Sequence, residues 1–415
     1  MMKTLRTLTT AVALVASAAA AATANPVSDW NLIAIAQNAG NPFNQARVVA
    51  TTQLAVFEAV NAVQGGYDPY VGTVVAPAGA SADAAAIAAA HRVLKFYFPA
   101  NAATLDGLKA TSLAAIPDGS AKAGGIATGE AAADAILATR VNDGATPVAF
   151  YLPNSNDPYQ WQLTAGCTAN GGILFNWPDL RTFGIANAED FRADPPPALT
   201  TPQYTRAFDE VKRVGSKNST ERPQDRTDVA RFYAGTSPAY IFNMVARQIS
   251  DAEGRSMLHL ARTLALVNMA ISDAAVASFA TKYHYTTWRP ETAIHNADVD
   301  DNPKTERDQG WEPYIVAPCF PSYTSNHASL SGAGAEVLRR VYGEGGHDIT
   351  ITNPAVSGGL VYHYLTLNQI LADIDDARVF GGIHFRFDQD AGGVLGRAVG
   401  TAVYKGNLRK IDAPQ

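Results

Sequence analysis

Two cations, Lys282 and Arg289, stand seven positions apart among aromatic residues in the stretch "TKYHYTTWRP". On a continuous helix, seven residues turn the chain by about 700°, which would place both side chains nearly on one face. Pro290 disfavours helical backbone at the residue before it, so we expect the helix to end near Arg289 and its guanidinium to turn towards the same target as Lys282. A simpler interpretation is that both cations cap the C-terminal end of a helix, where positive charge is favoured.

A serine and a histidine occur together in "YTSNHASLSGAGAEVL". Ser325 immediately precedes a helical pattern, so the first-turn N–H groups of Asn326 and His327 are predicted to be free donors beside a hydroxyl. With the helix dipole they would form an oxyanion site. The alternative is that Ser325 is only an N-cap, although a cap does not require His327 in the first turn.

Arg378 and His384 are six residues apart in "RVFGGIHFRFD". On a continuous helix, about 600° of rotation would point them away from each other. Gly381 and Gly382 are predicted to break the helix and allow the imidazole to turn back. Alternatively, the glycines form a helix C-cap and a buried histidine is satisfied by backbone.

Together, these stretches provide three cations, a hydroxyl, helix-start amides and two imidazoles. Such a set suits a tetrahedral oxyanion such as phosphate or vanadate, because it neutralises charge on several oxygens and places groups on the axial line. Buried cations in an acidic protein would be costly without a bound anion. The sequence therefore predicts one oxyanion site built from three distant stretches.

The composition is that of a globular, exported enzyme. The 415 residues are 47% hydrophobic and only 17% charged, which argues against a disordered or nucleic-acid-binding chain. Residues 1–24 read as a secretory signal, with Lys3 and Arg6, an apolar run, and a cleavage site near Ala24. Its removal leaves 30 basic residues (32 − 2) against 38 acidic ones, a charge of −8, so we expect no nucleic-acid partner and a secreted or periplasmic location.

Helical patterns dominate the remainder of the chain. Residues 25–145 form an alanine-rich helical region, residues 146–225 a proline-rich wrap or lid, and residues 226–415 the catalytic helical region. A linker between two helical units is the alternative for residues 146–225. We expect the helix carrying Lys282 to start at a capping box, Ser250–Glu253, and to be buried all round. No run of alternating β-branched residues is long enough for a sheet, and no apolar run is long enough to span a membrane. The predicted fold class is all-α.

Cys167 and Cys319 are the only cysteines. Two thiols are too few for a disulfide scaffold or an all-cysteine metal site, but one bridge can form in an oxidising compartment. Such a bridge would fix the proline-rich wrap over the site, whereas free thiols would leave the wrap unattached.

The combined motif, K-x6-R-P, S-x-H and R-x5-H, resembles the signature of vanadium-dependent haloperoxidases and type 2 phosphatidic acid phosphatases. The segments "KYHYTTWRPETAI" and "FGGIHFRFDQDAG" are similar in sequence to segments of secreted bacterial vanadium haloperoxidase-like proteins. The resemblance implies two four-helix bundles around the anion site. The resemblance also implies that the anion site holds vanadate as a cofactor, or phosphate as a substrate or bound ion. The implied oxyanion shell is Lys282, Arg289, Ser325, the Asn326 amide and Arg378.

Further roles follow from the same resemblance. His384 would bind vanadium axially or attack phosphorus, and His327 would be the acid-base partner. Lys282 would polarise peroxide towards attack by halide. Phe279 and Phe320 would line an apolar halide pocket, and a homodimer is expected on likeness alone. Hydrogen peroxide and a halide would be the substrates; the alternative is a phosphate ester, and a lesser one is an anion-binding protein without catalysis.

Two residues depart from the family pattern. Asn326 stands where a glycine is usual, so its side chain narrows the pocket or adds a contact. Thr324 stands where proline is usual. Several polar residues near the motifs, Asp273, Asp388 and Arg386, are either partners that orient the site or ordinary ion pairs. His284 and His295 are expected to be ordinary core or surface histidines.

Overall fold

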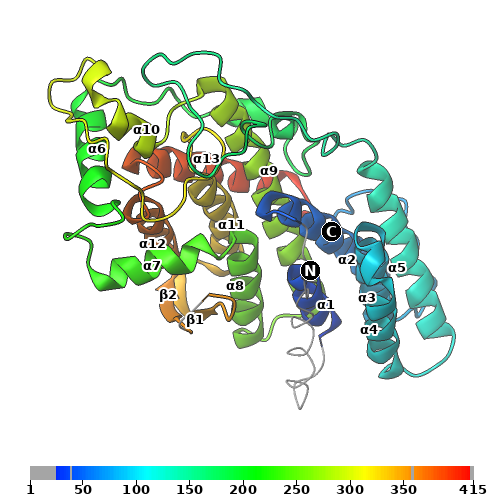
Figure 1. Cartoon of the computed structure of the whole chain (residues 1–415). Coiled ribbons are helices and arrows are strands. Elements are labelled where there is room, and N and C mark those ends of the chain that lie inside the picture. The colour runs from blue at the N-terminus through cyan, green and yellow to red at the C-terminus, as the bar shows by residue number, and fades with distance from the viewer. Residues whose placement is uncertain (1–24, 38–39, 357–358, 412–415) are drawn as a thin grey trace, which may run out of the picture.

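The computed structural model describes residues 25–37, 40–356 and 359–411, and the expected signal segment lies outside this part of the chain. Within it, thirteen α-helices and one small hairpin form an elongated, layered assembly (Figure 1), which confirms the all-α prediction. The α-helices are α1 (Pro26–Ala36), α2 (Pro42–Gln64), α3 (Ala82–Tyr97), α4 (Ala102–Ala114), α5 (Ser120–Thr139), α6 (Pro202–Val214), α7 (Gln224–Ala234), α8 (Pro238–Ala252), α9 (Met257–Tyr285), α10 (Pro290–His295), α11 (Asn326–Tyr342), α12 (Leu367–Phe380) and α13 (Arg386–Gly406).

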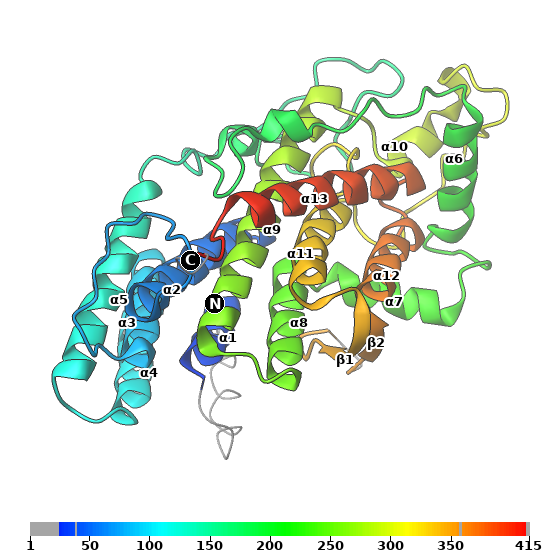
Figure 2. The same cartoon turned by 180° about the vertical axis from the view of Figure 1, so that it is seen from behind.

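Helix α9 is the central element. Every residue from Leu260 to Lys282 is buried, because α2 packs on one side of it and α8, α11 and α13 on others. Seen from behind, α9 stands between the α2–α5 helices and the α11–α13 helices (Figure 2). By length and composition α9 could cross a membrane, but its apolar window is wholly buried inside the molecule. It thus joins two helical bundles through one shared core.

The start of α9 differs from the prediction. The box at Ser250–Glu253 lies instead at the end of α8, which continues to Ala252. Gly254 then turns the chain with a φ of +60°, and Ser256 caps α9 by accepting a hydrogen bond from the His259 N–H. The prediction was wrong because the Ser-x-x-Glu spacing fits the interior of a helix as well as its start. The packing of α8 decides that these residues end α8 and do not start α9.

A small sheet also departs from the prediction. Strands β1 (Gly345–Thr352) and β2 (Val361–Thr366) pair in antiparallel fashion after α11. Ile349 and Ile351 are fully buried while their neighbours are more exposed, the alternation of a half-buried strand. The sequence "DITIT" carries this pattern over too few residues to stand out alone.

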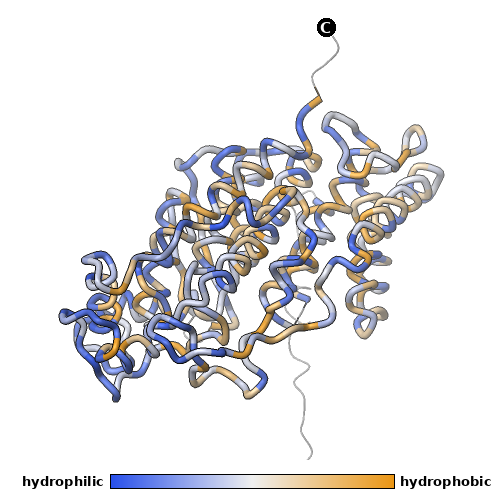
Figure 3. The backbone as a smooth tube through the Cα atoms, turned by 90° about the horizontal axis from the view of Figure 1, so that it is seen from above, coloured by the Kyte–Doolittle hydropathy of each residue, from blue (hydrophilic) through white to orange (hydrophobic). Residues whose placement is uncertain are grey.

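The proline-rich wrap is ordered and crosses the top of the molecule between α5 and α6 (Figure 1). It holds two 3₁₀ turns, η2 (Trp177–Asp179) and η3 (Ala188–Phe191), and its end forms α6. Asp273 of α9 accepts hydrogen bonds from three of its backbone N–H groups, at 2.7 to 3.1 Å. Hydrophilic residues gather in the loops at the α6–α10 end, whereas hydrophilic and hydrophobic residues alternate along the helices (Figure 3).

Candidate functional site

The cations of the first stretch lie where α9 ends. Lys282 is in the last turn of α9, and Thr286 closes that helix in a left-handed conformation. Arg289 has extended backbone, with φ −83° and ψ 159°, directly before Pro290 and α10. The helix therefore stops between the two cations, as the proline predicts. Both side chains are 0% exposed, so they do not act as surface caps of a helix end.

Arg289 reaches His384 directly. Its Nη1 donates to the Ile383 carbonyl at 2.7 Å and lies 3.0 Å from Nε2 of His384, while its Nε donates to the Phe320 carbonyl at 3.0 Å. An arginine can only donate, so Nε2 of His384 is the acceptor and carries a lone pair. The site thus holds an imidazole whose Nε2 lone pair, shared here with Arg289, can also bind an electrophile.

The opposite nitrogen of His384 is held by Asp388. Nδ1 donates to Oδ2 of Asp388 at 2.8 Å, and Ser322 Oγ donates to the same oxygen at 2.6 Å. A carboxylate on one ring nitrogen fixes the tautomer and the orientation of the ring. Asp388 therefore orients the imidazole and is not an ordinary surface ion pair.

The glycine pair turns His384 back as predicted. Helix α12 ends at Phe380, and Gly382 adopts a φ of +78°. A Cβ at Gly382 would lie 2.3 Å from the Gly215 carbonyl oxygen, so no larger residue fits there. This turn places His384 before α13, within reach of Arg289.

Helix α11 begins at the site. Ser325 is its N-cap and accepts a hydrogen bond from the Ala328 N–H at 3.4 Å, so the capping interpretation holds. Within the described chain, the N–H groups of Asn326 and His327 have no backbone or side-chain acceptor, so they remain available to an oxyanion. Thr324 lies close to Ser278 and Ser329, with oxygen distances of 3.1 and 3.4 Å.

Several buried donors of the described residues have no partner. At the site they are Nη2 of Arg289, Nε and Nη1 of Arg378, and Nδ2 of Asn326, whose acceptor Oδ1 is also unpartnered. Buried polar groups are normally hydrogen-bonded, so unsatisfied guanidinium donors point to an anion. Lys282 uses two of its three N–H bonds on the carbonyls of Pro321 and Ser322, both at 2.8 Å. These donors suit the oxygens of vanadate or phosphate.

Burial dominates the electrostatics of this site. Burial lowers the pKa of Arg378 to about 10. Burial, together with the charge of Arg378, lowers the pKa of Arg289 to about 9. The pKa of Lys282 falls well below its ordinary value, through burial and then the charge of Arg289. Burial raises the pKa of Asp388 to about 6, opposed by the Ser322 hydrogen bond. An anion would relieve the mutual repulsion of the three cations.

Both imidazoles are neutral near pH 7. Burial, and then the charges of Arg289 and Lys282, lower the pKa of His384 well below its usual range. Burial and the charge of Arg378 lower that of His327, while hydrogen bonds to the backbone of Thr236 and Tyr233 act in the opposite direction. His327 is the one member of the predicted set that is partly exposed.

Three phenylalanines form a cluster beside the cations. The ring centroids of Phe279 and Phe320 are 5.4 Å apart, and Phe43 of α2 packs against them at 4.8 and 6.0 Å. The Phe320 centroid lies 5.1 Å from Lys282 Nζ and 5.1 Å from Arg289 Cζ, a cation–π geometry. Phe43 was missed, because a phenylalanine near the start of a helix carries no signal of a contact made more than two hundred residues away.

The cysteines form a disulfide beside this cluster. Cys167 of the wrap is bonded to Cys319, the residue before Phe320. The bridge fixes the wrap next to the site, which answers the question that the sequence left open.

The remaining polar residues near the motifs lie outside the site. Asp273 holds the wrap, and burial raises its pKa to about 6. Arg386 pairs with Glu210 and Asp376. His295 lies 2.8 Å from the Trp311 carbonyl, and the ring of His284 packs against Tyr285.

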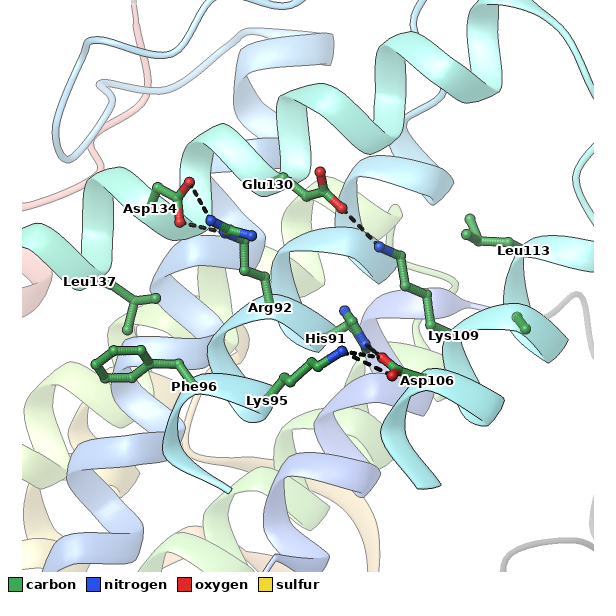
Figure 4. A pocket seen from close by; sticks show the side chains of 11 residues that line it. His91, Arg92, Lys95, Phe96, Asp106, Lys109, Leu113, Glu130, Asp134 and Leu137 are labelled. Carbon is green, nitrogen blue, oxygen red and sulfur yellow. Dashed lines mark hydrogen bonds and ion pairs between the residues drawn. The ribbon is translucent and has the colours of Figure 1, made fainter. Parts of the chain in front are cut away.

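Another cavity offers a contrast. It encloses about 690 Å³ between α3, α4 and α5 (Figure 4). Each of its basic side chains, Arg92, Lys95 and Lys109, is bonded to a carboxylate, whereas the cations of the candidate site use carbonyls or keep free donors. The positive charges in the cavity of Figure 4 are thus already neutralised by carboxylates.

Comparisons with known proteins show what this chain is similar to. Residues 262–413 match the family model of the VCPO second helical-bundle domain. The vanadium chloroperoxidase of Curvularia inaequalis is 27% identical over 188 residues, which cover 37% of this chain and 30% of that protein. The segment that matches this family model includes Lys282, Arg289, Ser325, Arg378 and His384.

Two solved structures share the fold of this chain over most of their length. The crystal structure of the first bacterial vanadium-dependent iodoperoxidase has a TM-score of 0.78 at 22% identity, covering 94% of this chain and 97% of that one. An apo-type bacterial vanadium-dependent chloroperoxidase has a TM-score of 0.70 at 18% identity, covering 87% and 92%. At these identities the likeness shows the fold alone.

Proposed function

We propose that this protein is a vanadate-dependent haloperoxidase that oxidises a halide with hydrogen peroxide. The observation that carries the proposal is the buried imidazole of His384, with a lone pair on Nε2, facing cations with unpartnered donors. The related chloroperoxidase of Curvularia inaequalis and the bacterial structures support the choice of peroxidase over other uses of an oxyanion site.

The residues present fit vanadate. His384 would supply a nitrogen ligand, while Arg289, Arg378, Lys282, Ser325 and the Asn326 amide would hold the oxygens. When bound, vanadate supplies a Lewis-acidic centre that activates an oxygen atom without changing its own oxidation state. The overall reaction, X⁻ + H₂O₂ + H⁺ → HOX + H₂O, transfers two electrons from the halide to peroxide.

The chain's own groups would move the protons and bind the halide. Neutral His327 can take a proton from peroxide, because its pKa lies well below the usual range. Lys282 would polarise the peroxide oxygen that the halide attacks. The rings of Phe279, Phe320 and Phe43 exclude water from the cations, which strengthens their effect on the reacting oxygens.

A phosphomonoesterase is the second candidate. The same Nε2 lone pair is that of a nucleophile for phosphorus, with His327 as the acid for the leaving group. A homodimer remains a prediction. We also propose that the protein is secreted or periplasmic, on the basis of the N-terminal sequence.

The test is to add orthovanadate to the purified protein and to follow peroxide-dependent oxidation of iodide and bromide beside hydrolysis of p-nitrophenyl phosphate. We expect halide oxidation that depends on vanadate and is lost in His384→Ala but kept in His295→Ala, whose imidazole lies outside the site. Ester hydrolysis alone would select the phosphatase, and activity in His384→Ala would refute the role of His384 as a ligand or nucleophile.

A further inference from the structure

The Asp388 carboxylate lies near Lys282 and Arg289 but pairs with neither. Burial lowers the pKa of both cations, and the charge of Asp388 acts in the opposite direction at each. In the described part of the chain, however, its one ion-pair contact is with Nδ1 of His384, at 2.8 Å. Buried charges of opposite sign normally pair. Other contacts must therefore hold Asp388 away from the cations.

One oxygen of Asp388, Oδ2, is held by three donors. It accepts hydrogen bonds from Nδ1 of His384 at 2.8 Å, from Ser322 Oγ at 2.6 Å and from the Phe385 N–H at 3.2 Å. The other oxygen, Oδ1, is buried and has no partner among the described residues. Two of the donors stand within four positions of Asp388, whereas Ser322 is 66 positions away. Ser322 is thus the donor that ties Asp388 to another part of the fold.

Ser322 is itself fixed on both sides. It is 0% exposed, its N–H donates to the Thr287 carbonyl at 3.0 Å, and its own carbonyl accepts a hydrogen bond from Lys282 Nζ at 2.8 Å. The Pro321 carbonyl accepts a second hydrogen bond from the same Nζ, also at 2.8 Å. A residue with this backbone anchoring offers its hydroxyl from a defined position. Ser322 therefore binds the cation through its backbone and the carboxylate through its side chain, and separates the two.

We propose that Ser322 is a positioning residue whose hydroxyl keeps the Asp388 carboxylate away from Lys282 and Arg289, so that these cations stay open to the anion. The inference rests on the proposed function, because vanadate is the anion expected, but it requires no step of the halide reaction. Without the hydroxyl, the carboxylate can rotate so that Oδ1, which has no donor, gains one from a cation. Asp388 would then compete with the anion for the same donors and would orient the imidazole less well.

The test is a double-mutant cycle with anion binding as its readout. Ser322→Ala removes the hydroxyl, Asp388→Asn removes the competing charge while it keeps an oxygen for the His384 N–H, and the double variant completes the cycle. Ser322→Cys, which keeps the volume but donates weakly, is the second variant. Ser250→Ala deletes a hydroxyl that is 1% exposed at the end of α8 and is the matched control. Calorimetric titration at pH 7.5 gives the Kd for orthovanadate and, separately, for phosphate.

We expect the Kd for orthovanadate to rise by about tenfold or more in Ser322→Ala, because a carboxylate on either cation removes at least one charge-assisted hydrogen bond from the anion. The rise should be smaller in Ser322→Cys, and Ser250→Ala should leave the Kd unchanged. In the Asp388→Asn background, Ser322→Ala should change the Kd by less than about twofold, because no charge is left to compete.

Two results overturn the proposal while the proposed function stands. One is an unchanged Kd in Ser322→Ala, and the other is an equal rise in both backgrounds, which would show that Ser322 acts through packing alone. If the wild type binds phosphate but not orthovanadate, the haloperoxidase function fails and the same cycle with phosphate decides the role of Ser322. Binding of neither anion by the wild type overturns both.

Discussion

Arg378→Met should stabilise the anion-free protein while removing its response to vanadate. Arg378 is 4% exposed, two of its nitrogens have no partner, and its pKa is about 10 against an ordinary 12.5. The difference corresponds to a penalty of about 3 kcal/mol for holding the charge in the fold. Methionine keeps a long apolar side chain without that penalty, so the free energy of unfolding should rise by about 1 to 3 kcal/mol.

Although Arg378→Met should stabilise the fold, it should weaken the binding of vanadate. The two unpartnered nitrogens would each make a charge-assisted hydrogen bond, worth about 1.5 to 3 kcal/mol, so the Kd for vanadate should rise by a factor of about 100 or more. At a vanadate concentration of 100 times the wild-type Kd, the ligand stabilises the wild-type protein by about 2.7 kcal/mol, and a variant with a 100-fold weaker Kd by only about 0.4 kcal/mol.

The assay is urea unfolding at pH 7.5 with and without orthovanadate. Arg92→Met serves as the control, because its guanidinium is exposed and paired with Asp134; it should leave the vanadate effect unchanged. The reasoning is refuted if Arg378→Met is less stable than the wild type without vanadate and is still stabilised by vanadate to the same extent.

Two further predictions concern pH and the disulfide. The pKa of His384 is lowered in the fold, so its contribution to stability is present above the unfolded value near 6.5 and is lost as the pH falls. Between pH 7.5 and pH 5.5 the unfolding free energy of His384→Gln should fall by about 1.4 kcal/mol less than that of the wild type. Equal falls in the two proteins would contradict this. The bridge between Cys167 and Cys319 closes a loop over a separation of 152 residues, so replacing both by alanine should lower the unfolding free energy by about 5 kcal/mol; an unchanged value, or free thiols in a non-reducing peptide map, would count against the bridge.

Local features of the fold were predictable because their causes are local. Ser237 and Ser325 cap the helices that they precede, and Gly381 and Gly382 end α12, since capping and glycine turns depend on residues a few positions apart. The start of α9 and the hairpin β1–β2 were not predictable, because each depends on which side of the segment is buried by distant helices.

For the site, the sequence by itself determined its chemistry: three cations, two imidazoles and a hydroxyl with spacings that suit an oxyanion. Only the tertiary structure decided that Arg289 and His384 lie 3.0 Å apart, that Asp388 orients the imidazole, and that Phe43 packs against the phenylalanines beside the cations. Charge and donor capacity are properties of residue types and so are written in the sequence. Convergence on one target depends on packing between segments far apart in the chain, which no local pattern encodes.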